Sequence, residues 1–84
     1  MTNFSTIKLE ILDRIAILSL NRPEKLNAMN FQMIHELIDC TKSISTNDEI
    51  RCLILRGEGN AFCSGADLSS GEKKWKDTEE SLNK

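Results

Sequence analysis

The sequence from position 15 to position 20 reads Ile15-Ala16-Ile17-Leu18-Ser19-Leu20, which is apolar at every position but one. A short run of this kind is typical of a β-strand that is covered on both faces. Residues 7–11 alternate apolar and polar side chains, which indicates a strand with one face toward water. Because Asp13 and Arg14 between the two runs favour a tight turn, we predict an antiparallel hairpin.

The region after the hairpin predicts a loop and then a helix. Residues 21–28 contain the only proline of the chain and two asparagines, which are residues that favour turns. Asn30 is a typical N-cap residue, so we predict a helix from about Asn30 to about Ser45. Ile34, Leu37, Ile38 and Thr41 recur along one side of this segment, with Met33 and Ile44 beside them. The residues expected in the core are Phe31, Met33, Ile34, Leu37 and Ile38.

A third strand is predicted at residues 51–56, an apolar run bounded by Gly57 and Gly59. We expect it to be buried and to lie parallel to residues 15–20, joined through the helix by a right-handed crossover. The fold class is therefore an α/β segment of the order strand, strand, helix, strand. One helix shields only one face of a sheet, so we expect the sheet to be incomplete, with a layer of cover missing.

The chain divides into a main segment, residues 1–68, and a short tail, residues 69–84. Half of the tail residues are charged, and Trp75 and Leu82 are its only large apolar side chains. Such a composition buries too little surface to offset its ordering entropy. We expect the tail to be mobile or to begin a lid-like helix.

Length and charge exclude several classes of function. Eighty-four residues suit one small domain, and a net charge of −2 provides no broad positive field for nucleic acid or an anionic membrane. The longest apolar run is far shorter than the roughly 20 residues that span a bilayer. The first residues lack the basic and apolar regions of a signal peptide, so we expect a cytoplasmic protein.

The cysteines and the histidine give no sign of a metal site. Cys40, Cys52 and Cys63 are an odd number without a Cys-x-x-Cys pair, and His35 is the only histidine. A closed zinc site would have to gather its ligands from separate elements. We therefore predict reduced cysteines, a partly exposed His35 and no bound metal.

Residues 57–68 depart from the common catalytic motifs. The run from Gly57 begins like a dinucleotide-binding fingerprint, but Phe62 occupies the position that needs a third glycine. Ser64 lacks the flanking glycines of a nucleophile elbow. Cys63 has no base near it in the sequence, and a small buried core residue is the simpler interpretation.

Both remaining candidate segments follow central strands. The carboxyl ends of parallel strands lie at one edge of a sheet, so the loops at residues 22–28 and 61–68 should share one rim. In the second loop four small residues follow Phe62, which leaves main-chain N–H groups unobstructed. Free N–H groups aimed at an oxygen are the components of an oxyanion hole.

Two motifs in these loops carry a resemblance to a known family. The first reads ILSLNRPEKLNAMN over residues 17–30, and the second reads AFCSGADL over residues 61–68. Together they resemble the amino-terminal part of the enoyl-CoA hydratase/isomerase (crotonase) superfamily, and the likeness extends over about residues 7–68. The resemblance implies a crotonase-like fold.

The resemblance also implies a ligand and its contacts. The ligand would be an acyl-CoA or enoyl-CoA thioester, with coenzyme A as part of the substrate and no separate cofactor. The main-chain N–H of Ala66 would stabilise the enolate-like oxyanion. Asp67 and Leu68 would meet the thioester and CoA through main-chain groups, while Lys25, Asn27 and Ala28 would lie along CoA, with Lys25 placed to pair with a phosphate.

Several alternatives stay open. Asp67 either caps the following helix or contacts the ligand. Hydration of enoyl-CoA is the commonest reaction of the superfamily, but an isomerase, hydrolase, decarboxylase or carbon–carbon lyase would look the same over these residues. By resemblance, the second oxyanion glycine and the acid/base glutamates come from downstream segments, and full-length members form homo-oligomers. The chain is therefore expected to be a truncated crotonase that is inactive alone, or a non-catalytic CoA-binding or interaction module.

Overall fold

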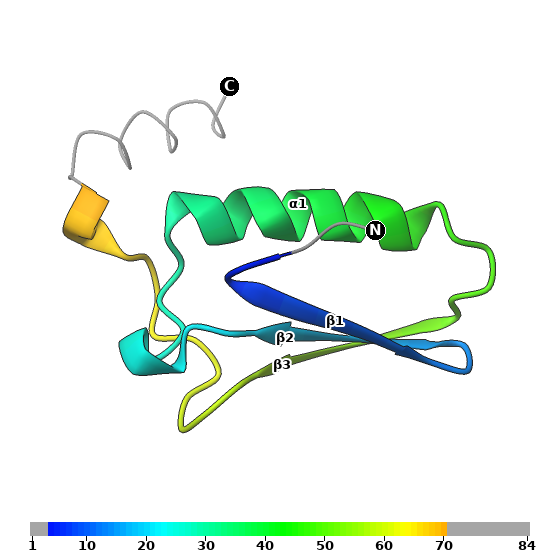
Figure 1. The fold of residues 1–84 in the computed structure, drawn as a ribbon, viewed down its shortest axis with the longest axis horizontal. Coiled ribbons are helices and arrows are strands. Elements are labelled where there is room, and N and C mark those ends of the chain that lie inside the picture. The colour runs from blue at the N-terminus through cyan, green and yellow to red at the C-terminus, as the bar shows by residue number, and fades with distance from the viewer. Residues whose placement is uncertain (1–3, 71–84) are drawn as a thin grey trace.

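In the computed structural model a mixed three-stranded sheet packs against one long helix (Figure 1). The structure describes residues 4–70, so most of the predicted tail, residues 71–84, lies outside the described residues. Within the described residues no helix is both long and apolar enough to cross a membrane. The elements are β1 Ile7–Leu12, β2 Ile15–Leu20, the 3-10 turn η1 Pro23–Lys25, α1 Phe31–Ser45, β3 Cys52–Gly57 and the 3-10 turn η2 Leu68–Ser70.

The strands pair as the sequence predicts. β1 and β2 form an antiparallel hairpin in which Ile7 pairs with Leu20. β3 lies parallel to β2, so the sheet order is β1-β2-β3. At the hairpin turn Asp13 has φ of 55°, a left-handed conformation that aspartate tolerates better than most residues. The carboxyl ends of β2 and β3 therefore meet at one rim of the sheet (Figure 1).

The helix begins where its N-cap residue predicts. The Asn30 side chain accepts a hydrogen bond from the Met33 N–H at 2.8 Å, which satisfies one of the free donors of the first turn. The predicted core face is partly wrong, because Ile38 is 46% exposed and Cys40 is fully buried. The side chains that pack on the sheet are spaced by three or four residues: Met33, Leu37, Cys40 and Ile44.

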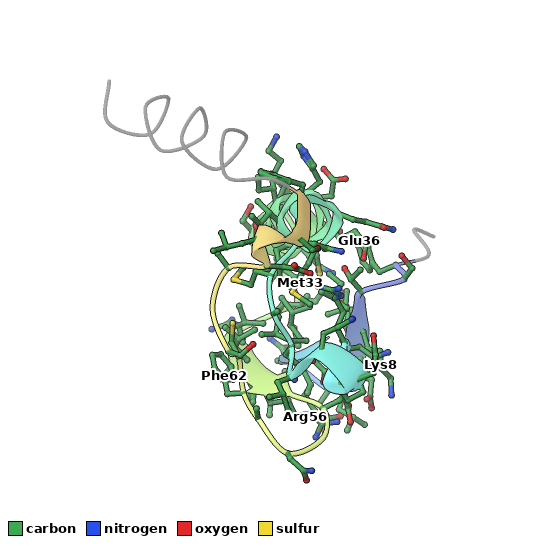
Figure 2. All side chains as sticks on the ribbon, turned by 90° about the vertical axis from the view of Figure 1, so that its left-hand side faces the viewer. Lys8, Met33, Glu36, Arg56 and Phe62 are labelled. Carbon is green, nitrogen blue, oxygen red and sulfur yellow. The ribbon has the colours of Figure 1, made fainter. Side chains whose placement is uncertain are left out.

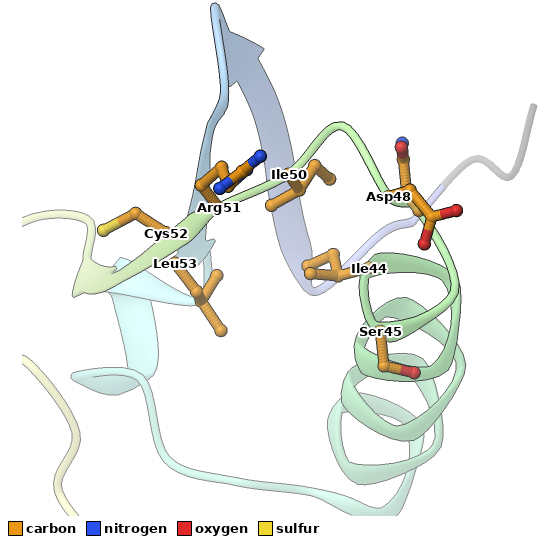
Figure 3. A pocket seen from close by; sticks show the side chains of 8 residues that line it. Ile44, Ser45, Asp48, Ile50, Arg51, Cys52 and Leu53 are labelled. Atoms are coloured by element: carbon orange, nitrogen blue, oxygen red, sulfur yellow. The ribbon is translucent and has the colours of Figure 1, made fainter.

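The core lies under α1 and is built from β1, β2 and the helix. Its buried members are Ile7, Ala16, Leu18, Leu20, Met33 and Cys40. The prediction that β3 is buried is wrong, because Leu53, Ile54 and Leu55 are 43%, 44% and 49% exposed. For Leu53 and Leu55, which share the helix-side face with Ala16 and Leu18, the reason is geometric: α1 packs over β1 and β2, and an open pocket of about 380 Å³ lies between its last turn and β3 (Figure 3). Ile54 points to the opposite face of the sheet, which has no helix over it among the described residues.

The sheet face away from the helix is partly covered by charged side chains. Arg56 donates to the fully buried Ser19 hydroxyl at 2.9 Å and pairs with Glu10 and Glu58, each at 3.6 Å. Lys8 and Arg56 lie on this side of the sheet (Figure 2). Near the rim, polar and charged side chains therefore cover part of the face that α1 leaves open.

Candidate functional site

The loops that follow β2 and β3 meet at the rim of the sheet, as the sequence predicts. Met29 and Ala66 form an isolated parallel bridge. The Met29 N–H donates to the Gly65 carbonyl at 2.8 Å, and the Asp67 N–H donates to the Met29 carbonyl at 2.9 Å. Two segments about 37 residues apart are thus joined as if they were short strands.

This bridge leaves the main-chain N–H of Ala66 pointing outward. In a parallel bridge the bonded groups belong to the neighbours of the central residue, so the groups of Ala66 point away from Met29. Within residues 4–70 the Ala66 N–H donates no hydrogen bond, and Ala66 is exposed. Ala66, to which the resemblance gives the oxyanion contact, is therefore an exposed residue whose N–H points away from Met29 and whose neighbours are fixed on both sides.

Glycines allow the second loop to reach this position. A Cβ on Gly57 would lie 2.5 Å from the Phe62 carbonyl oxygen, and a Cβ on Gly59 would lie 2.8 Å from the Pro23 side chain. Both contacts are closer than side chains permit, so the loop folds tightly on itself and on the first loop. Gly65 has φ of 109° with open space around it, so it contributes only the turn that precedes Ala66.

Asn27 joins the two loops from inside. Its side chain is fully buried, accepts from the Arg22 N–H at 2.7 Å, and donates to the Glu58 and Ala61 carbonyls at 2.8 and 2.7 Å. Its φ of 57° suits asparagine better than most residues. Asn27 is expected to lie along CoA with the rest of its loop, but its side chain offers CoA no polar atom, because both its oxygen and its nitrogen are engaged within the protein.

The other residues expected to meet CoA are more accessible. Lys25 is exposed in η1 and forms no ion pair with any residue from 4 to 70. Ala28 is half-buried, its N–H donates to the Lys25 carbonyl at 3.0 Å, and its carbonyl accepts from Arg22. Leu68, at the start of η2, is 62% exposed.

Asp67 has several partners. Its carboxylate accepts from the Ser69 N–H at 2.9 Å, as the capping interpretation expects, and pairs with the Arg22 guanidinium at 3.1 Å. The hydrogen bonds of Ser69, together with the hydrogen bond and positive charge of Arg22, lower the pKa of Asp67 from 3.8 to about 2. Its carboxylate is therefore ionised at neutral pH and is a weak base.

Arg22 is the residue of this site that the sequence analysis missed. Its side chain is only 13% exposed, and its Nη1 bonds both the Ala28 carbonyl and the Asp67 carboxylate. It therefore links the residue before Met29 to the residue after Ala66. The opposite charges of Arg22 and Asp67 are the only sequence signal for this ion pair. The pairing becomes evident only from the register of the Met29–Ala66 bridge.

Metal-ligating groups are dispersed over the described part of the chain. Among residues 4–70 no three or more histidine, cysteine, aspartate or glutamate side chains gather in one place. The cysteines there are free: Cys40 is buried, Cys52 is exposed and Cys63 is partly buried. Burial raises the pKa of the Cys40 thiol, which makes it a core residue and a poor nucleophile.

Comparison with known proteins assigns the chain to a family. Residues 15–84 match the family model described as enoyl-CoA hydratase/isomerase. The chain belongs to the enoyl-CoA hydratase/isomerase family. Its sheet and helix are accordingly part of a crotonase-like domain, as the resemblance implies.

Individual relatives of this enoyl-CoA hydratase/isomerase family member carry different names. The chain is 47% identical to 1,2-epoxyphenylacetyl-CoA isomerase of Escherichia coli (strain K12) over 55 residues, which are 66% of the chain and 21% of that relative. It is 36% identical to 3-hydroxyisobutyryl-CoA hydrolase 1 of Arabidopsis thaliana over 70 residues, which are 83% of the chain and 18% of that relative. The chain thus spans about a fifth of the length of these relatives.

A solved structure of the family has the same fold over this region. An enoyl-CoA hydratase/isomerase from Mycobacterium paratuberculosis superposes with a TM-score of 0.77 and 39% sequence identity, over 87% of this chain and 30% of that one. The likeness covers nearly the whole chain.

Proposed function

We propose that the rim binds an acyl-CoA thioester and that the Ala66 N–H donates a hydrogen bond to the thioester oxygen. One observation carries the proposal: the Ala66 N–H points outward while the adjacent Gly65 carbonyl and Asp67 N–H are both bonded to Met29. A donor that is fixed in advance does not have to reorganise as negative charge develops on the oxygen. Such a donor is worth about 3–4 kcal/mol of barrier lowering.

The remaining contacts follow from the positions of the exposed groups. Lys25 is the cation of the first loop that is free to meet a CoA phosphate, because Arg22 is occupied by Asp67. Ala28, three residues after this lysine, and Leu68, two residues after Ala66, complete the proposed contacts with CoA. Coenzyme A enters this scheme as part of the substrate, so we propose no separate cofactor.

For the reaction, we propose that this segment serves the hydration of an enoyl-CoA within a protein of the relatives' full length. The name of the matching family model supports this reaction class, whereas the isomerase and hydrolase names of individual relatives point to other reactions on CoA thioesters. The described residues contribute oxyanion stabilisation and CoA binding. We do not assign Asp67 the role of general acid or base, because Ser69 and Arg22 lower its pKa to about 2, which leaves no proton to donate at neutral pH and makes the carboxylate a weak base.

The site is tested by titrating ¹⁵N-labelled protein with crotonyl-CoA and, separately, with CoA. We expect the Ala66 amide resonance to move with the thioester only and the Lys25 and Ala28 resonances to move with both. Ala66→Pro removes the N–H and should lower the preference for crotonyl-CoA over CoA at least tenfold. An Ala66 resonance that does not respond to crotonyl-CoA would contradict the proposal.

A second candidate function is a non-catalytic CoA-binding or interaction module. The exposed apolar side chains of β3, Leu53 to Leu55, favour it, because they would suit contact with another protein surface. Loss of the enoyl thioester absorbance of crotonyl-CoA in the presence of the protein separates the two candidates. Turnover by a protein of the relatives' full length that contains this segment supports the hydratase, whereas binding without turnover by that longer protein supports the module.

A further inference from the structure

We infer that Arg22 is a positioning residue that sets the direction of the Ala66 N–H, acting through Asp67 and Ala28. This inference rests on the proposed function of Ala66. It concerns a residue that contacts neither the thioester oxygen nor, in our proposal, CoA.

The first argument is the order of the bonds around Ala66. Gly65 and Asp67, on either side of Ala66, are both bonded to Met29. Arg22 then joins Ala28, next to Met29, to the carboxylate of Asp67. A rotation of the Ala66 peptide group therefore has to break the bridge to Met29 and pull the Asp67 carboxylate from Arg22. The two hydrogen bonds of Met29 and the Arg22–Asp67 ion pair thus all oppose this rotation.

The second argument is that Arg22 is itself held firmly. Its N–H donates to the buried Asn27 side chain at 2.7 Å, and its carbonyl accepts from the N–H groups of Lys25 and Asn27 at 2.9 and 2.8 Å. Its side chain and that of Asp67 are only 13% and 14% exposed. An ion pair so little exposed is weakly screened by solvent and has a defined geometry, unlike a surface pair.

The third argument is a contrast with the other arginine of this end of the sheet. Arg56 pairs with Glu10 and Glu58 at 3.6 Å, and its side chain is 51% exposed. Its partners lie in β1, in β2 and at the start of the second loop: Glu10, Ser19 and Glu58. Arg56 is therefore a matched arginine whose loss should leave the Ala66 N–H in place.

The experiment compares Arg22→Gln with Arg56→Gln in the 84-residue chain. Calorimetry gives the dissociation constants for crotonyl-CoA and for CoA, and circular dichroism checks that each variant is folded. We expect Arg22→Gln to lower the preference for crotonyl-CoA about tenfold while the CoA constant changes less than twofold. Arg56→Gln should change neither, and Arg22→Lys should restore part of the preference because it keeps the charge.

Two other results for Arg22→Gln also decide the inference. Equal losses of crotonyl-CoA and CoA affinity in Arg22→Gln would overturn the inference, since they indicate a merely structural role. If Arg22→Gln does not fold, Asp67→Asn carries the same test, because it keeps an oxygen acceptor for Ser69, and we expect a smaller loss of preference from it.

The proposed function fails if the wild-type protein has equal dissociation constants for crotonyl-CoA and CoA, an outcome that is distinct from the result for the Arg22 variant. The positioning role is then decided by the Ala66 amide resonance of the free protein. Arg22→Gln must move it and Arg56→Gln must not, and an unmoved Ala66 resonance in Arg22→Gln overturns the inference.

Discussion

The rim loops and the third strand are held in opposite ways. The loops at residues 21–29 and 58–67 bury few large apolar side chains, yet hydrogen bonds of Asn27, Arg22 and Met29 join them. β3 is rich in apolar residues, yet Leu53, Ile54 and Leu55 remain exposed. The chain thus fixes its candidate site by hydrogen bonds and close packing within itself, while its sheet still has apolar surface without cover.

The largest expected effect tests the close packing of the rim. Gly57→Val places a side chain where the Cβ alone would lie 2.5 Å from the Phe62 carbonyl oxygen, so we expect a loss of about 4 kcal/mol in unfolding free energy. Urea unfolding followed by circular dichroism measures it. Gly65→Ala is the control, because only its φ of 109° is unfavourable, and it should lose about 1 kcal/mol. Equal losses would show that the second loop is not packed as described.

Asn27→Ala tests the polar connection between the loops. It leaves the Arg22 N–H and the Glu58 and Ala61 carbonyls without their partner, so we expect a loss of about 3 kcal/mol in unfolding free energy. Leu26→Asn is the control in the neighbouring left-handed position, where Leu26 is 51% exposed and has φ of 53°. It should be neutral or slightly stabilising. If the Asn27→Ala protein were as stable as wild type, hydrogen bonds would not be what holds the rim loops, and their contrast with β3 would be lost.

Glu36 lies outside the rim and tests whether hydrogen bonds stabilise the chain there as well. Its carboxylate accepts hydrogen bonds from Ser5, Thr6 and Gln32. Desolvation raises its pKa, but hydrogen bonds from Thr6, Gln32 and Ser5 outweigh this and lower it from 4.5 to about 2. A lowered folded pKa contributes stability above pH 4.5 that is lost as the pH falls toward 2. We expect Glu36→Gln to lose about 2 kcal/mol at pH 7 and almost nothing at pH 2.

Denaturant unfolding at a series of pH values measures this difference. Asp39→Asn, at an exposed position of the same helix, is the control and should stay within about 0.5 kcal/mol of wild type at pH 7. A Glu36→Gln difference that is the same at pH 7 and pH 2 would contradict the linkage.

The smallest expected effect comes from β3. Leu55→Ala removes a side chain that is 49% exposed, so we expect a loss of less than about 1 kcal/mol. Leu18→Ala, at the paired position of β2, removes a side chain that is 1% exposed and should lose about 3 kcal/mol. Similar losses at the two positions would mean that β3 is covered in solution, which would erase the contrast with the rim.

The sequence predicts the elements well because local signals determine them. Asn30 marks the start of α1, the apolar run at residues 15–20 marks β2, and the crossover rule makes β3 parallel to it. The placement of Ala66 at the rim follows from the same rule. Burial is predicted less well, because Leu55 is apolar in the sequence but lies beyond the reach of α1.

The connections between the loops could not be predicted from the sequence. The roles of Asn27 and Arg22 depend on the Met29–Ala66 register, which joins residues distant in the chain. Asn27 was expected to contact CoA because it lies in the matching motif. The structure adds a role that the motif does not reveal: its left-handed backbone and buried side-chain amide support the two loops of the site.

The most direct test of the account is amide hydrogen exchange of the unliganded protein, read residue by residue by NMR. The Met29 and Asp67 amides are bonded across the bridge, so the account predicts that both are protected while the Ala66 amide between them exchanges fast. Protection of Ala66 equal to that of its neighbours would contradict the account, because its N–H would then already be engaged and could not meet a thioester oxygen.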